Sequence, residues 1–204
     1  MTRPAVKRTG LKLVLAICAL MHACVQITAQ ETKIWRAGLF SFSDELGGFR
    51  ILSVSGPGSH DDPIVIHQEM YSSYSATLVI RSALLKQTPQ SFGHVSNGAL
   101  YMKLVTVNHT NLPWVGFGLE LQEILDKPSI YGDGLSFDQL SRNDAAFYSD
   151  QFLNFSGEFE PADRLVYTNG WVDALSEVSI NFLITDYTPV QKFYLYQDPM
   201  IPAS

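Results

Sequence analysis

Apolar and polar residues alternate along most of this chain with a period of two. Between residues 179 and 185, for example, Ile180, Phe182 and Ile184 alternate with polar neighbours. This alternation is typical of a β-strand with one buried face. The same rhythm, in segments rich in β-branched and aromatic residues, predicts about nine strands. They are 34–42, 49–54, 64–68, 76–81, 100–104, 115–122, 165–167, 179–185 and 192–196.

Turn-forming residues separate these segments. Gly56-Pro57-Gly58 follows the second segment, and Asn97-Gly98 precedes the fifth. Asn169-Gly170 predicts a tight hairpin that joins segment 165–167 to Trp171-Val172, because such turns need residues that tolerate a positive φ. The regular spacing of strands and turns favours an antiparallel arrangement.

Helical patterns are few and short. Residues 121–125 predict one helical turn at the end of a strand. Ser136 and Gln139 have the spacing of a capping box, which predicts a short helix through Leu140. No internal repeat or change in composition divides the chain after residue 30. The sequence therefore predicts a single all-β domain over 30–204, an antiparallel β-sandwich or jelly roll with one or two short helical turns.

The first 29 residues have the composition of a secretory signal peptide. Basic residues precede an uncharged apolar run at 13–21, and Ile27-Thr28-Ala29 offers a cleavage site before Gln30. The apolar run is shorter than the roughly 20 residues that span a bilayer, so we expect no transmembrane segment. Met21-His22-Ala23-Cys24 resembles a lipoprotein box only loosely, and we do not expect a lipid anchor at Cys24. The pattern predicts export to the periplasm or the extracellular space.

Removal of this leader changes the composition. Four of the 14 Lys and Arg residues and none of the 20 Asp and Glu residues lie within it, so the mature chain carries a net charge of −10. Such an acidic surface repels nucleic acid, which is bound through Lys and Arg. Both cysteines, Cys18 and Cys24, also lie in the leader. An exported domain without disulfides is more typical of bacteria than of eukaryotes.

A polar segment from 126 to 150 interrupts the strand pattern, and long loops of this kind are often functional. Asp133, Asp138 and Asp144 lie within it and offer oxygen ligands for Ca²⁺, although their spacing matches no known calcium loop. Solvated loop carboxylates are the simpler interpretation. Apart from this calcium hypothesis, the sequence indicates no cofactor.

Two further groups are candidates for chemistry. His67 and Glu69 share one face of a strand, and a neighbouring strand could bring His94 or His109 near, which would assemble a three-ligand metal site. Exposed histidines on strands and turns are the alternative interpretation. No spacing of a nucleophile and its base stands out, but catalytic triads are assembled in space, so a hydrolase with a spatially assembled site stays open.

Four tyrosines are candidates for an exposed ligand-binding surface. Tyr71 and Tyr74 are placed where outward positions are plausible. Tyr194 and Tyr196 alternate with Phe193 and Leu195, so both tyrosines face outward if the latter pair fills the core. Exposed planar rings suit the faces of sugar rings, whereas large rings also cover the edges of sandwiches for purely structural reasons.

The C-terminal part carries one resemblance. The runs 163–167, 178–186, Phe193-Tyr194-Leu195 and Gln197-Asp198-Pro199 are similar in strand rhythm to the closing strands of exported β-sandwich proteins of Gram-negative bacteria, which form uncharacterised families. The resemblance implies a fold and no functional residue.

Together these features predict an exported, non-enzymatic binding or structural module with an envelope or extracellular partner or a glycan as its ligand. A carbohydrate- or calcium-dependent binding module is the first alternative, and the hydrolase is the second.

Overall fold

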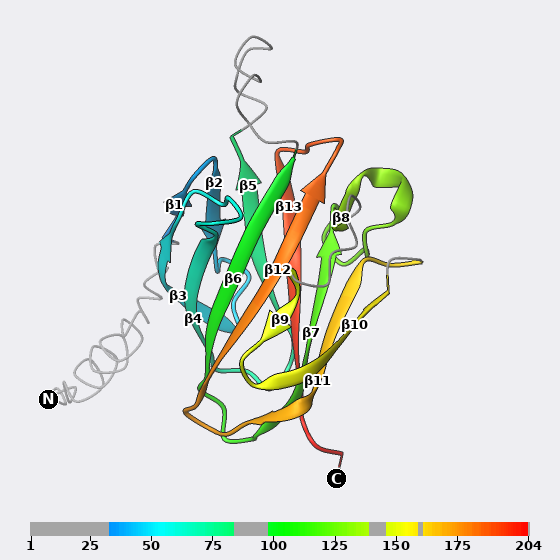
Figure 1. Ribbon diagram of the computed structural model, residues 1–204. Helices are drawn as coiled ribbons and strands as arrows, with labels where there is room; N and C mark the ends of the chain where they lie inside the picture. Colours follow the sequence, from blue (N-terminus) through cyan, green and yellow to red (C-terminus); the bar gives the residue numbers. More distant parts are fainter. Residues whose placement is uncertain (1–32, 84–97, 139–145, 159–160, 204) are drawn as a thin grey trace, which may run out of the picture. The chain divides into compact units, whose positions relative to one another are not determined.

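The computed structural model describes residues 33–83, 98–138, 146–158 and 161–203, which belong to one compact unit, 32–204. Their strands form two β-sheets (Figure 1). Sheet A has the order β1 (Trp35–Ala37), β2 (Phe40–Ser43), β5 (Ala76–Ser82), β13 (Lys192–Met200), β7 (Trp114–Gln122), β11 (Arg164–Val172) and β10 (Phe152–Glu158). Sheet B has the order β3 (Phe49–Ser55), β4 (Ile64–Met70), β6 (Ala99–Asn108), β12 (Glu177–Asp186) and β8 (Leu135–Phe137), and β9 (Tyr148–Ser149) also pairs with β12.

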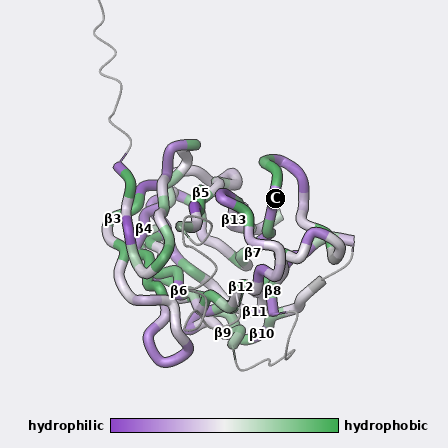
Figure 2. The backbone as a smooth tube through the Cα atoms, turned by 90° about the horizontal axis from the view of Figure 1, so that it is seen from above, coloured by the Kyte–Doolittle hydropathy of each residue, from purple (hydrophilic) through white to green (hydrophobic). Residues whose placement is uncertain are grey.

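The core lies between the two sheets. Leu119 and Leu195 of sheet A and Ile66 and Leu104 of sheet B are each 0% exposed. Burial of one such side chain contributes about 2 kcal/mol, so the alternation of each central strand fixes which face turns inward. Seen from above in Figure 2, β5, β13 and β7 lie in one layer and β6 and β12 in the other.

Sheet B is mixed rather than wholly antiparallel. Strand β4 pairs in parallel with β6, in a register that places Met70 opposite Asn108. The cause is the path of the chain, because β5, which lies between β4 and β6 in sequence, belongs to sheet A. All other strand pairs among the described residues are antiparallel.

The all-β sandwich predicted from the sequence is confirmed, with thirteen strands in the described residues rather than about nine. Gly38, at a φ of +53°, divides the predicted segment 34–42 into β1 and β2. Strands β8, β9 and β10 were not predicted. Strands β8 and β9 are only three and two residues long, too short to show a period.

Three local predictions are wrong. Asn169-Gly170 does not form a hairpin, because β11 continues through it with an irregularity between Thr168 and Val172 in its pairing with β7. Ser136 begins no helix, since it lies in β8 opposite Thr185. Residues 121 and 122 complete β7, and a 3₁₀ turn follows only later, at Tyr131–Asp133.

Candidate functional site

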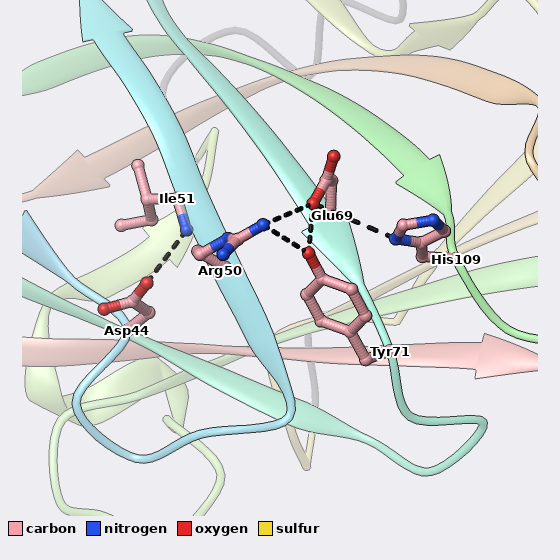
Figure 3. A network of polar contacts seen from close by, with 6 residues as sticks. All are labelled: Asp44, Arg50, Ile51, Glu69, Tyr71 and His109. Carbon is pink, nitrogen blue, oxygen red and sulfur yellow. Dashed lines mark hydrogen bonds and ion pairs between the residues drawn. The ribbon is translucent and has the colours of Figure 1, made fainter. Parts of the chain in front are cut away.

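Four side chains from three segments converge on the surface of sheet B, and we call them the Tyr71 cluster: Arg50, Glu69, Tyr71 and His109 (Figure 3). An Nη2 donor of Arg50 lies 2.8 Å from Tyr71 Oη and 3.2 Å from Glu69 Oε2. Tyr71 Oη also donates a short hydrogen bond to Glu69. The rings of Tyr71 and His109 are stacked at a tilt, with 5.0 Å between centroids, and His109 Nδ1 lies 3.9 Å from Glu69.

The pairing of the strands explains why these residues meet. Arg50 of β3 and Glu69 of β4 are direct cross-strand partners. The parallel β4–β6 pair places the ends of both strands side by side, and the His109 amide donates to the Met70 carbonyl over 2.9 Å. Tyr71 and His109, each one residue beyond its strand, therefore leave sheet B at the same point.

The cluster is open to solvent and oriented by its own contacts. Tyr71 is 45% exposed, and the side chains of Arg50 and His109 are 56% and 39% exposed. The hydrogen bond from Tyr71 lowers the pKa of Glu69, and the same contact raises the pKa of Tyr71. At neutral pH Glu69 is therefore a carboxylate and Tyr71 a neutral phenol. The cluster therefore presents the Glu69 carboxylate as an acceptor, the Arg50 guanidinium as a donor and the partly exposed ring of Tyr71.

The predicted tyrosines of β13 lie on the outer face of sheet A. Phe193 and Leu195 are buried in the core, as the alternation predicts. Tyr194 is only 8% exposed and Tyr196 is half-buried. Lys192 Nζ lies 5.4 Å from the centre of the Tyr194 ring. Tyr194 therefore presents much less ring surface than Tyr71 does.

Polar side chains surround these two tyrosines. Gln122 of β7 is opposite Tyr194, and Glu120 is opposite Tyr196. Glu120 is 4% exposed, forms a short ion pair with Arg164 of β11, and accepts a hydrogen bond of 2.8 Å from Gln122. A buried carboxylate needs such partners. This face is therefore held together by its own polar groups.

The predicted calcium residues do not form one exposed group in the described part of the chain. Asp133 Oδ2 accepts from Ser129 Oγ and the Ile130 amide, and Oδ1 accepts from the Leu135 amide. Asp138 is 3% exposed and has a partner of its own. Asp144 lies outside the described residues. Asp133 thus caps a turn with both carboxylate oxygens.

A buried carboxylate that the sequence did not single out lies beside that turn. Asp163 is 0% exposed, its Oδ1 accepts a hydrogen bond of 2.5 Å from Ser136 Oγ, and its Oδ2 has no partner among the described residues. Burial, and to a smaller extent the nearby Asp133, raise its pKa to about 6, although the hydrogen bond from Ser136 lowers it. Nothing in the sequence around Asp163 marks it as buried, and only the fold shows that it is enclosed.

The structure tests part of the predicted three-ligand metal site. The structure brings Glu69 and His109 together as the strand pattern suggested, whereas His94 lies outside the described residues. Over the described ranges, no three His, Cys, Asp or Glu side chains are grouped so that they could hold a metal ion. Arg50, which completes the cluster, was missed because its pairing with Glu69 depends on a register that one strand alone does not reveal.

Comparison with known proteins assigns this chain to no family. No family profile matches this chain, and no curated protein shows significant similarity to it. The resemblance of the C-terminal strands to exported proteins of Gram-negative bacteria stays a prediction. Within the part of the chain that the structure describes, no helix is long and apolar enough to cross a membrane.

Proposed function

We propose that this protein is an exported, non-enzymatic binding module of the bacterial periplasm or extracellular space, and that it binds a glycan at the Tyr71 cluster. The proposal rests on one observation. An accessible tyrosine ring lies beside an arginine and a carboxylate that hold each other in place on a rigid sheet.

The chemistry of the cluster suits a sugar. Tyr71 is 45% exposed, although Arg50 Cζ lies 5.6 Å from its ring centre and His109 packs beside it, and the exposed part of the ring offers an apolar surface for the C–H face of a sugar ring. Arg50 and His109 offer N–H donors and Glu69 offers a charged acceptor, a combination that matches neighbouring hydroxyl groups. Because the three polar groups already restrain one another, little side-chain entropy is lost when a ligand binds.

The lowered pKa of Glu69 argues against a role as general acid at this cluster. A general acid needs a pKa near the working pH, which burial usually provides. Glu69 is held ionised by Tyr71 and Arg50, so it serves as an acceptor and not as a proton donor. Glu69 is therefore suited to accept hydrogen bonds from ligand hydroxyl groups.

A glycan microarray, followed by calorimetry with the best ligand, tests the proposal. We expect Tyr71→Ala to weaken binding at least about tenfold, because both the stacking plane and the orienting hydroxyl are lost. Tyr71→Phe keeps the plane and should weaken binding less. Tyr187→Ala is the matched control, since Tyr187 is 47% exposed and follows β12 at the opposite end of sheet B. Absence of any glycan ligand, or equal binding by Tyr71→Ala, contradicts the proposal.

The proposed export of the protein is tested by a separate experiment. We expect the mature protein to begin at Gln30, because Ile27-Thr28-Ala29 fits a signal-peptidase site. Intact-mass analysis of protein recovered from the periplasm or medium measures this directly. A diacylglycerol-modified Cys24 would place the protein on a membrane instead.

A further inference from the structure

A pocket of about 330 Å³ lies at the β1 edge of sheet A, far along the sheet from β10. Its lining includes Ile34 and Arg36 of the β1 region, Leu39 and Phe40 of the next turn and strand, and Arg81 of β5. This volume is at the lower end of the roughly 300–1,000 Å³ range of small-molecule sites. The pocket is large enough for one compact organic molecule.

The pocket is basic although the protein is acidic. The pairing of β1, β2 and β5 aligns Arg36, Ser41 and Arg81 across the sheet, and Lys192 of β13 follows in the same row. No Asp or Glu lines the pocket, in a chain with 20 acidic residues against 14 Lys and Arg. The row of basic side chains gives this edge of the sheet a local positive potential.

The two arginines have different roles. Arg81 is fixed, because Glu45 accepts from its Nη2 at 2.7 and 2.8 Å and Ser43 accepts from its Nη1 at 3.4 Å. The hydrogen bond from Ser43 lowers the pKa of Glu45, so Glu45 is ionised and balances the Arg81 charge. The Arg36 side chain has no hydrogen bond or ion pair with any other described residue. Arg36 is thus the uncompensated charge of the pocket.

We infer that this pocket binds a small organic monocarboxylate with an apolar body, through Arg36 and the free N–H groups of Arg81. A guanidinium fork matches the two oxygens of a carboxylate. One uncompensated arginine balances one negative charge, whereas a dianion such as sulfate needs two. Ile34, which is 51% exposed, and Leu39, Phe40 and Ala83 provide an apolar wall.

Two main-chain amides of the pocket already donate to carbonyl groups of the pocket itself. The Ser82 amide donates to the Gln191 carbonyl, and the Ala83 amide donates to the Leu39 carbonyl. These two amides are therefore not free to bind the ligand. This site is independent of the Tyr71 cluster, which lies on sheet B.

Titration of the ¹⁵N-labelled protein at constant ionic strength tests the inference, with benzoate, acetate and sulfate as probes. We expect saturable shifts of the Gly38, Ser41 and Ala83 amides with benzoate, at a Kd in the millimolar range or tighter. Acetate lacks the apolar body and should bind roughly tenfold more weakly. Sulfate should bind no better than acetate.

Two variants separate the site from general attraction of anions. Arg36→Gln removes a side chain that stabilises no described contact, and it should raise the benzoate Kd roughly tenfold while the protein stays folded. Lys127→Gln removes an exposed positive charge elsewhere and should leave the Kd unchanged. The inference is overturned if benzoate gives no saturable shift, if sulfate binds as tightly as benzoate, or if Arg36→Gln binds benzoate normally.

Discussion

Gln68 of β4 and Gln197 of β13 join the two sheets across the interior of the sandwich, with 2.5 Å between Gln68 Nε2 and Gln197 Oε1. Both residues are 0% exposed, and Gln68 Nε2 also donates to Thr106 Oγ1 over 2.9 Å. Their other amide atoms, Gln68 Oε1 and Gln197 Nε2, have no partner among the described residues. The pair is therefore a polar link with an energetic cost inside an apolar core.

The contributions of Gln68 and Gln197 to stability should not be additive. We expect Gln197→Leu to lower the free energy of unfolding by about 1 to 3 kcal/mol, because Gln68 loses its partner while staying buried. The double variant Gln68→Leu/Gln197→Leu should be more stable than the sum of the single effects implies, by about 1 kcal/mol. Urea denaturation of the four proteins measures the coupling. Simple additivity would show that the two amides do not interact.

Stability should fall as the pH rises through the range in which Asp163 ionises. Burial raises the pKa of Asp163 in the folded state to about 6, above the unfolded value near 4, and burial raises the pKa of Asp186 likewise to about 6. At these two groups the folded protein therefore binds more protons than the unfolded chain between about pH 4 and pH 6, so their contribution to stability is fully present below pH 4 and is lost as the pH rises through about 6.

The variant Asp163→Asn isolates the part of this effect that comes from one residue. It keeps an acceptor for Ser136 and removes the charge, so we expect it to gain about 2 to 3 kcal/mol over the natural chain at pH 8 and almost nothing at pH 4. Asp61→Asn is the control, because its side chain is 96% exposed. Thermal unfolding from pH 4 to pH 8 measures both variants, and a pH-independent difference would contradict the assignment.

Asn108 should be essential for the turn between β6 and β7. Its amide donates to the Leu112 and Val172 carbonyls at 2.9 and 3.1 Å, and its Oδ1 accepts from Thr110 Oγ1 at 2.7 Å. We expect Asn108→Ala to cost about 3 kcal/mol, since several buried groups lose their partners. Asn154→Ala, at an exposed position of β10, should change stability by less than about 0.5 kcal/mol. Chemical denaturation compares the two, and equal effects would refute a special role for Asn108.

Calcium should not stabilise the protein. Both carboxylate oxygens of Asp133 already accept hydrogen bonds that hold the 3₁₀ turn, so a cation would have to displace them. A bound ion at a hundredfold excess over its Kd would add about 2.7 kcal/mol and raise the Tm by several degrees. We expect the same Tm in chelator and in millimolar calcium. A reproducible rise that disappears in Asp133→Ala would restore the calcium site.

The sequence predicted the fold class because burial of one strand face leaves a period that can be read without a partner. The alternation in 179–185 and 192–196 correctly identified core residues of β12 and β13, including Phe193 and Leu195. The prediction that only one face of β12 is buried was wrong, since Ser179, Asn181 and Thr185 on its other face are at most 9% exposed. Short edge strands such as β9 carry no such period. Asn169-Gly170 has the composition of a hairpin turn, but pairing of β11 with β7 and β10 on its two sides keeps the strand continuous.

The candidate sites depended on tertiary structure. The sequence placed Glu69 and His109 on neighbouring strands, but their meeting with Arg50 required the register of β3 with β4 and the parallel pairing of β4 with β6. The pocket at Arg36 and Arg81 required the order of β1, β2 and β5 in sheet A. A local pattern determines which face of a strand is buried, because that depends on its own side chains. Which strands become neighbours, and in what register, depends on contacts between residues far apart in the chain, so only the folded structure decides it.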